Sequence, residues 1–163
     1  MTDTTRTSDT VAATVEAATD SAMRALGRRL GRLLRAGDVL ILSGPLGAGK
    51  TTLTQGIGEG LDVRGPVTSP TFVISRIHPS LSGGPALVHV DAYRLGDSVE
   101  IDDLDLDSEL PHSVTIVEWG AGVAEELSDD RLEIVIERRA DDTRVLRLTG
   151  VGARWADADL GTE

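Results

Sequence analysis

Residues 44–51 read GPLGAGKT, and the interpretation of the whole 163-residue chain starts from this stretch. It matches the pattern G-x-x-x-x-G-K-[ST], in which a glycine-rich loop joins a strand to a helix and turns its backbone N–H groups toward phosphate oxygens. Glycines at positions 44, 47 and 49 permit backbone conformations that other residues avoid. Lys50 is the only lysine in the chain, and its compact ammonium on a flexible stem can reach between two phosphates. We therefore predict a phosphate-binding loop.

The sequence on both sides of the loop supports this prediction. Residues 39–42, VLIL, form a short aliphatic run typical of a strand that is covered on both faces. Residues 52–57 can begin a helix, whose positive dipole end would face a bound phosphate. The residues predicted to bind the nucleotide at this loop are Gly44, Pro45, Leu46, Gly47, Ala48, Gly49, Lys50, Thr51 and Thr52.

The remaining patterns predict the fold class. Apolar residues between Ala17 and Leu34 recur at steps of three and four, which predicts an amphipathic helix. Residues 86–91 and 114–118 are further buried-strand candidates, and residues 131–138 and 143–148 alternate apolar with charged side chains as a hairpin does. This order predicts an α/β fold of the P-loop NTPase type. Its mixed sheet would have a parallel centre and antiparallel edge strands, with helices on both faces.

The length corresponds to one domain, which we place at residues 16–150. Residues 1–15 are rich in Thr, Ser and Asp, and residues 151–163 are small, acidic and aperiodic, so we expect both ends to be mobile. The start has no signal-peptide core, and no aliphatic run is long enough to span a bilayer. These features predict a cytoplasmic protein without a membrane partner.

Composition excludes several classes of site. The formal net charge of −11 repels phosphate backbones and argues against direct binding of RNA or DNA. The chain has no cysteine, which excludes disulfides, thiolate zinc sites and cysteine nucleophiles.

Two carboxylates end the predicted inner strands. Asp91 and Glu118 would both emerge at the carboxyl edge of the sheet, where open α/β folds bind ligands. Transfer of a phosphoryl group from ATP needs a divalent metal, and an acid near the loop can hold it. Each acid taken alone could equally cap the turn that follows it. The three histidines are too dispersed for a metal cluster, and Trp119 and Trp155 are expected to be packing residues.

Four motifs occur in a specific order: SGPLGAGKTT at 43–52, TSPTF at 68–72, HVDAYRL at 89–95 and VEWG at 117–120. In this combination the chain resembles the bacterial TsaE family, the P-loop ATPase of tRNA threonylcarbamoyladenosine biosynthesis. The resemblance runs from about residue 22 to residue 147.

The resemblance implies an ATPase that uses ATP and Mg²⁺ and works with two partner subunits, TsaB-like and TsaD-like, so that tRNA is engaged only indirectly. It implies that Thr51 and Glu118 hold the metal and that Asp91 serves hydrolysis, which makes Asp91 and Glu118 the predicted catalytic residues. Thr71 would lie near the nucleotide in a segment that behaves as a switch. One position departs from the family pattern, because Met23 stands where a threonine near the nucleotide is frequent.

Other functions share part of this pattern. A small nucleoside or metabolite kinase would have the same loop and strand-end acids, but it usually needs an arginine-bearing lid, and no helical lid is evident after Glu118. A guanine-nucleotide switch would need an N-K-x-D motif, which cannot exist because Lys50 is the sole lysine. A scaffold protein with a vestigial loop would need none of the phosphate- and metal-binding groups, but Lys50, Thr51, Asp91 and Glu118 are all present.

Overall fold

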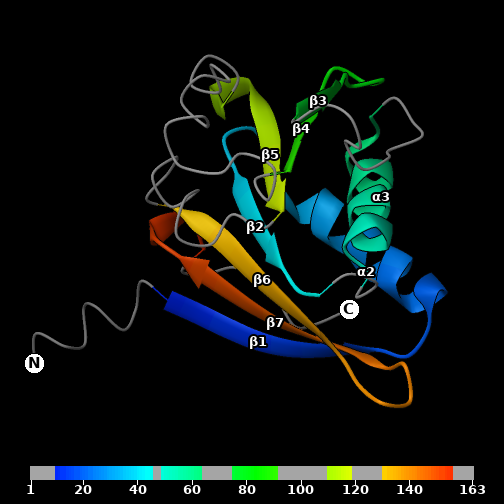
Figure 1. Ribbon diagram of the computed structural model, residues 1–163. Coiled ribbons are helices and arrows are strands. Elements are labelled where there is room, and N and C mark those ends of the chain that lie inside the picture. The colour runs from blue at the N-terminus through cyan, green and yellow to red at the C-terminus, as the bar shows by residue number, and fades with distance from the viewer. Residues whose placement is uncertain (1–9, 46–48, 64–74, 92–109, 119–129, 156–163) are drawn as a thin grey trace, which may run out of the picture.

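The computed structural model describes residues 10–45, 49–63, 75–91, 110–118 and 130–155 (Figure 1). All the described strands belong to one seven-stranded sheet of order β1-β7-β6-β2-β5-β4-β3. The strands are β1 (Thr10–Ala17), β2 (Val39–Ser43), β3 (Ser75–His78), β4 (Ala86–Asp91), β5 (Ser113–Glu118), β6 (Arg131–Arg138) and β7 (Arg144–Val151). The helices are α2 (Asp20–Leu33) and α3 (Lys50–Leu61), with short 3₁₀ turns η3 (Leu110–His112) and η5 (Ala153–Trp155).

The sheet has a parallel centre and antiparallel edges, which confirms the predicted fold class. Strand β2 pairs in parallel with β5 on one side and β6 on the other, and β4 continues the parallel arrangement beside β5. The outer pairs, β3 with β4, β6 with β7 and β7 with β1, are antiparallel. Residues 39–42 are all buried, as expected for a central strand with both faces covered.

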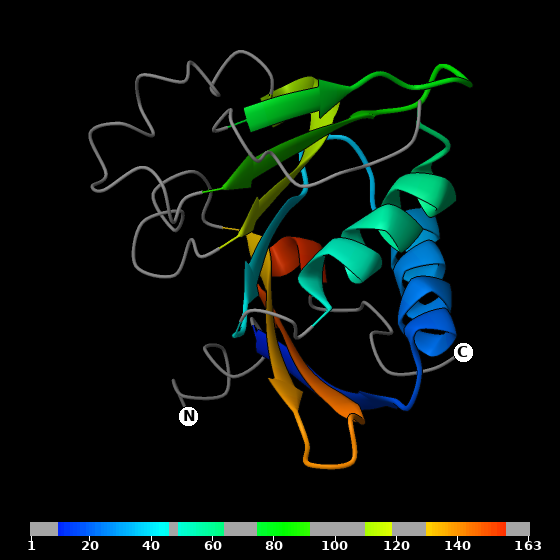
Figure 2. The same cartoon turned by 45° about the vertical axis from the view of Figure 1, so that its right-hand side comes forward.

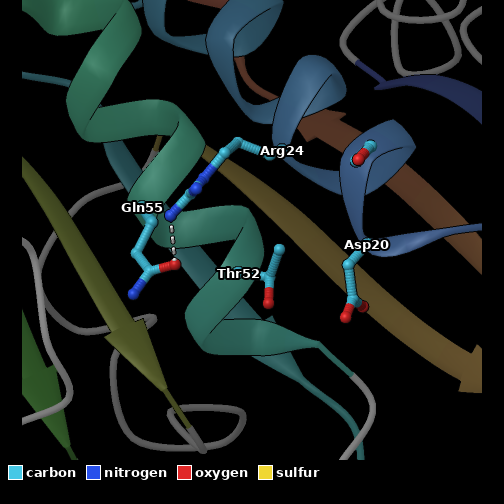
Figure 3. A pocket seen from close by; sticks show the side chains of 5 residues that line it. Asp20, Arg24, Thr52 and Gln55 are labelled. Carbon is cyan, nitrogen blue, oxygen red and sulfur yellow. Dashed lines mark hydrogen bonds between the residues drawn. The ribbon is translucent and has the colours of Figure 1, made fainter.

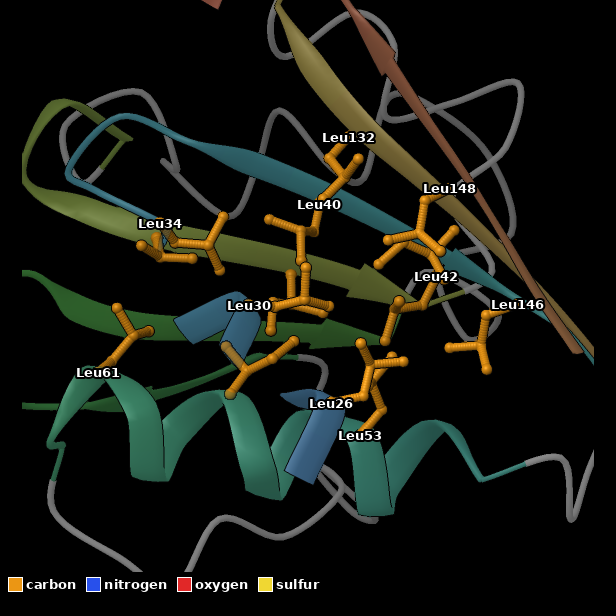
Figure 4. Close-up of a cluster of buried hydrophobic side chains, with 14 of the residues drawn as sticks. Leu26, Leu30, Leu34, Leu40, Leu42, Leu53, Leu61, Leu132, Leu146 and Leu148 are labelled. Atoms are coloured by element: carbon orange, nitrogen blue, oxygen red, sulfur yellow. The ribbon is translucent and has the colours of Figure 1, made fainter. Parts of the chain in front are cut away.

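Both described helices lie side by side on one face of the sheet (Figure 2). The second face carries no described helix, so the predicted helix cover of both faces remains a prediction. Within the described residues, no helix is both long enough and apolar enough to cross a membrane. Leucines from helices and strands fill the space between the two layers (Figure 4): Leu26, Leu30, Leu34, Leu40, Leu42, Leu53, Leu61, Leu132, Leu146 and Leu148.

Glycines allow the two helices to approach closely. They occur at four-residue spacing on each helix, at Gly27 and Gly31 of α2 and at Gly56 and Gly60 of α3. A Cβ atom on Gly56 would lie 2.3 Å from the carbonyl oxygen of Arg24, so no side chain fits there without moving a backbone. The close contact holds α3, and with it the first residues of the predicted site, directly against α2. The apolar periodicity used in the sequence analysis does not reveal this contact.

Residues 10–15, which the composition assigns to the N-terminal segment outside the domain, form most of a strand. These residues belong to β1, which pairs antiparallel with β7 from Thr10 opposite Val151 to Ala17 opposite Arg144. The Thr, Ser and Asp residues of this segment lie mostly before the strand, whose alternate residues Ala13, Val15 and Ala17 pack against the hydrophobic core. The amphipathic helix consequently starts at Asp20, where the Thr19 hydroxyl accepts a hydrogen bond from the Ala22 N–H at 3.0 Å.

Residues 151–155, at the start of the expected C-terminal tail, belong to the described fold. Trp155 is fully buried, which confirms its predicted packing role, whereas Trp119 lies outside the described residues. The Arg154 guanidinium bonds both oxygens of buried Asp38 at 2.9 and 3.0 Å and donates to the Leu33 carbonyl at 3.0 Å. It also stacks on the Trp155 ring, 4.3 Å from its centroid. This ion pair ties the end of the domain to the turn between α2 and β2.

Candidate nucleotide site

The glycine-rich loop joins a strand to a helix, as predicted. Strand β2 ends at Ser43 and α3 begins at Lys50, while Leu46, Gly47 and Ala48 of the loop lie outside the described residues. Gly49, at the N-terminal boundary of α3, has φ of +102°, a left-handed conformation that favours glycine. A Cβ there would lie 2.8 Å from Cε of Met23, so the buried Met23 side chain packs beneath the end of the loop.

Lys50 folds its side chain back over this loop. Its ammonium nitrogen donates to the carbonyl oxygens of Gly44 at 2.8 Å and Pro45 at 3.1 Å, and the residue is only 6% exposed. Carbonyl oxygens carry no net charge, so a phosphate oxygen would be a stronger acceptor for the same ammonium group. The lysine is therefore already placed at the loop, where it could exchange a carbonyl for an anionic ligand.

The first turn of α3 adds backbone donors at the same place. Lys50, Thr51 and Thr52 are the first three residues of this 12-residue helix. The first N–H groups of a helix have no partner inside it, and they carry its partial positive charge. The end of α3 and the ammonium of Lys50 thus form one electropositive site in a chain whose net charge is −11.

The two predicted catalytic residues lie beside each other at the edge of the sheet. In the parallel register of β4 and β5, Asp91 is opposite Glu118, and Glu118 is opposite Leu42 of β2. Leu42 lies two residues before Gly44, the first glycine of the loop. The fold therefore brings the backbones of both acid residues to the edge at which the loop begins, as the strand-end positions predict.

Glu118 has a buried partner that the sequence analysis missed. The Nε2 atom of His89 lies 2.5 Å from Oε2 of Glu118, the imidazole is fully buried, and the Glu118 side chain is 9% exposed. A signal for this contact exists in the H-x-D spacing, because alternate residues of β4 share a face, and the register pairs Asp91 with Glu118. His89 begins the HVDAYRL motif and is one of three dispersed histidines, and neither observation predicts its contact with Glu118.

A pocket of about 260 Å³ opens between the starts of α2 and α3 (Figure 3). Its lining residues are Asp20, Ser21, Arg24, Thr52 and Gln55. Arg24 donates from Nη2 to the side-chain oxygen of Gln55 at 2.7 Å, which links the two helices across the pocket. Thr52 is a predicted nucleotide-binding residue, so the pocket adjoins the loop site.

The residues of the site fit a magnesium ion bound mainly through a nucleotide. Among the described residues, no group of three or more His, Asp or Glu side chains could hold a metal alone. Magnesium commonly takes only one or two protein ligands together with substrate phosphates and water, and it prefers oxygen. The Thr51 hydroxyl and the Glu118 carboxylate are donors of that kind. Thr71, the remaining predicted nucleotide-binding residue, lies outside the described residues.

Comparison with known proteins identifies the family of the chain. Residues 17–146 match the sequence profile of the family described as "Threonylcarbamoyl adenosine biosynthesis protein TsaE". The chain therefore belongs to the TsaE family. This finding confirms the resemblance that the four motifs indicate.

Members of the TsaE family from several bacteria are similar to the chain. Proteins named tRNA threonylcarbamoyladenosine biosynthesis protein TsaE include one from Streptomyces coelicolor, 63% identical over 85% of this chain and 97% of its own length. The protein of that name from Bacillus subtilis is 42% identical over 81% of this chain and 82% of its own length. The crystal structure of Bacillus subtilis YdiB matches the fold with a TM-score of 0.70 and 34% identity, covering 90% of both chains.

Proposed function

We propose that this protein is an ATPase subunit that supports the biosynthesis of tRNA N6-threonylcarbamoyladenosine. It binds and hydrolyses ATP with Mg²⁺ in a complex with two partner subunits, TsaB-like and TsaD-like. The observation that carries the proposal is the convergence of Lys50, the first turn of α3 and the acid edge of β4 and β5 at one end of the sheet. Membership of the TsaE family supplies the pathway.

The nucleotide would lie along the start of α3. Its β- and γ-phosphates would take the ammonium of Lys50 and backbone N–H groups of the loop and of the first turn of α3. The nucleoside would then extend past Thr52 toward the pocket that Arg24 and Gln55 line. Met23 is buried beneath Gly49, so no hydroxyl at that position assists in binding.

Thr51 and Glu118 would hold the magnesium ion that accompanies ATP. When bound, this ion neutralises charge that develops on the phosphate oxygens. Asp91, opposite Glu118 in the sheet register, would accept a hydrogen bond from the attacking water and orient it. The chain's own contribution is thus to position the phosphates, the metal and the water, which is the main requirement of phosphoryl transfer.

The charge of the chain supports indirect contact with tRNA. A net charge of −11 opposes binding to a phosphate backbone, but it does not hinder docking on protein partners. We therefore assign tRNA contact to the partner subunits and place the protein in the cytoplasm with them.

The test compares Lys50→Ala with Arg131→Ala as a matched control. Arg131 pairs with Glu133 at 2.7 Å, and it starts β6 at the sheet end opposite the loop, so both variants lose one positive charge. We expect calorimetry to show that Lys50→Ala no longer binds ATP·Mg²⁺, whereas Arg131→Ala still does. Reconstituted tRNA modification should fail when Lys50→Ala replaces the unmodified protein. Unchanged ATP affinity in a folded Lys50→Ala protein would contradict the proposal. A rise in ATP consumption by the isolated protein on adding a nucleoside or sugar would favour a kinase instead.

A further inference from the structure

We propose that His89 is a positioning residue that holds the carboxylate of Glu118 in the orientation needed to bind a divalent metal. The inference rests on the proposed function, and it adds a residue to which neither the motifs nor the comparisons give a role. It starts from the contact between His89 Nε2 and Glu118 Oε2 at 2.5 Å.

The register of the sheet dictates this contact. His89 lies two residues before Asp91 on β4, and Asp91 is opposite Glu118 on β5. Residues two apart on a strand share a face, so the side chains of His89 and Glu118 lie diagonally across the same face of the sheet. An ionised carboxylate only accepts hydrogen bonds, so the ring donates from Nε2.

One carboxylate oxygen is thereby fixed and the other is left for a ligand. Oε2 of Glu118 is held by the imidazole, and Oε1 is the oxygen that a metal could take. A buried carboxylate without a hydrogen-bond donor is costly, and the histidine supplies that donor where Glu118 is 9% exposed. Partners that orient a metal ligand in this way typically contribute 10- to 100-fold in metal affinity.

The surroundings of His89 argue against a purely structural role. Its Nδ1 is buried and has no hydrogen-bond partner within the described part of the chain. A histidine kept only for packing would have no need of a polar ring, because an apolar side chain would fill the same space without a desolvated nitrogen. The one described hydrogen bond of the ring is the one it donates to Glu118, so the contact with that carboxylate explains the choice of residue.

The experiment uses His89→Gln, His89→Asn and His89→Leu in the full chain. The Gln amide reaches about as far as Nε2, whereas the Asn amide is shorter and Leu cannot donate. Val88→Ala is the control, since Val88 is a buried neighbour on the opposite face of β4 and its loss destabilises the same strand. For each protein, ATP affinity is measured with magnesium and with a chelator, and the ratio of the two affinities is the readout.

We expect the magnesium-dependent gain in ATP affinity to fall at least about tenfold in His89→Asn and His89→Leu, with metal-free binding retained. His89→Gln and Val88→Ala should stay within about threefold of the unmodified protein. An unchanged ratio of the two ATP affinities in folded His89→Asn and His89→Leu would overturn the inference about His89 but not the proposed function. Absence of magnesium-dependent ATP binding in the unmodified protein would overturn the proposed function instead.

A second measurement tests the contact first in the unmodified protein. Long-range ¹H–¹⁵N spectra of the metal-free protein report which ring nitrogen of His89 carries the hydrogen. We expect the hydrogen on Nε2, and a changed His89 signal in Glu118→Gln. A ring with its hydrogen on Nδ1 alone would overturn the inference, because Nε2 could then not donate to the carboxylate.

Discussion

Gly56→Ala separates two opposing effects at the contact between α2 and α3. Helix propensity favours alanine over glycine by about 1 kcal/mol, so an isolated helix would gain stability. In the folded protein the new Cβ would lie 2.3 Å from the carbonyl oxygen of Arg24. That separation is about 1 Å shorter than an ordinary carbon–oxygen contact of about 3.3 Å. The obstructing atom belongs to the backbone, so the helices must move apart.

The packing effect should exceed the propensity effect. Overpacking a close contact costs about 1–3 kcal/mol, and a backbone obstacle places this site near the upper end. Subtracting the propensity gain leaves a loss of about 2 kcal/mol in the free energy of unfolding. For a domain of this size the midpoint of thermal unfolding should fall by about 4–8 °C. Because α3 also carries Lys50, weaker ATP binding should accompany the loss of stability.

The assay is urea and thermal unfolding of Gly56→Ala beside Gly84→Ala. A Cβ on Gly84 would meet only the Ser80 hydroxyl, at 3.8 Å, so this control should remain within about 0.5 kcal/mol of the unmodified protein. If Gly56→Ala were as stable as the unmodified protein, or more stable, propensity alone would govern the site and the close approach of the helices would be refuted.

Three further predictions concern the site and the C-terminal ion pair. Thr51→Ala should weaken the magnesium dependence of ATP binding while some metal-free binding remains, and an unaltered magnesium titration would argue against its role. Asp91→Asn and Glu118→Gln should each keep ATP binding and lose about a hundredfold in the rate of ATP hydrolysis, measured with and without the partner subunits. Hydrolysis at the rate of the unmodified protein would show that neither carboxylate has the role proposed for it. Arg154→Ala should lower the free energy of unfolding by about 3 kcal/mol, because it leaves the buried Asp38 carboxylate unpaired, and a change below 0.5 kcal/mol by urea denaturation would disprove that contribution.

Local patterns in the sequence determined the central strands and the glycine-rich loop between β2 and α3. Two loop residues are required for properties of their own: Gly49 adopts a left-handed backbone that favours glycine, and Lys50 supplies an ammonium group. The aliphatic runs at 39–42 and 114–118 predicted buried parallel strands, because only side chains that can be covered on both faces suit those positions. Since parallel strands share a carboxyl edge, the common edge of Asp91 and Glu118 was also predictable.

Contacts between distant parts of the chain were decided only by the tertiary structure. Strand β1 pairs with β7, which lies more than 120 residues away in the chain, and the Thr, Ser and Asp residues before β1 give no sign of this partner. Arg154 and Asp38 are 116 residues apart, and either one alone looks like a surface charge. The H-x-D spacing places His89 and Asp91 on one face of β4, but only the register of β4 with β5 brings Glu118 to the His89 ring. A side chain's partner across the fold depends on register and close approach, which no local pattern of residues records.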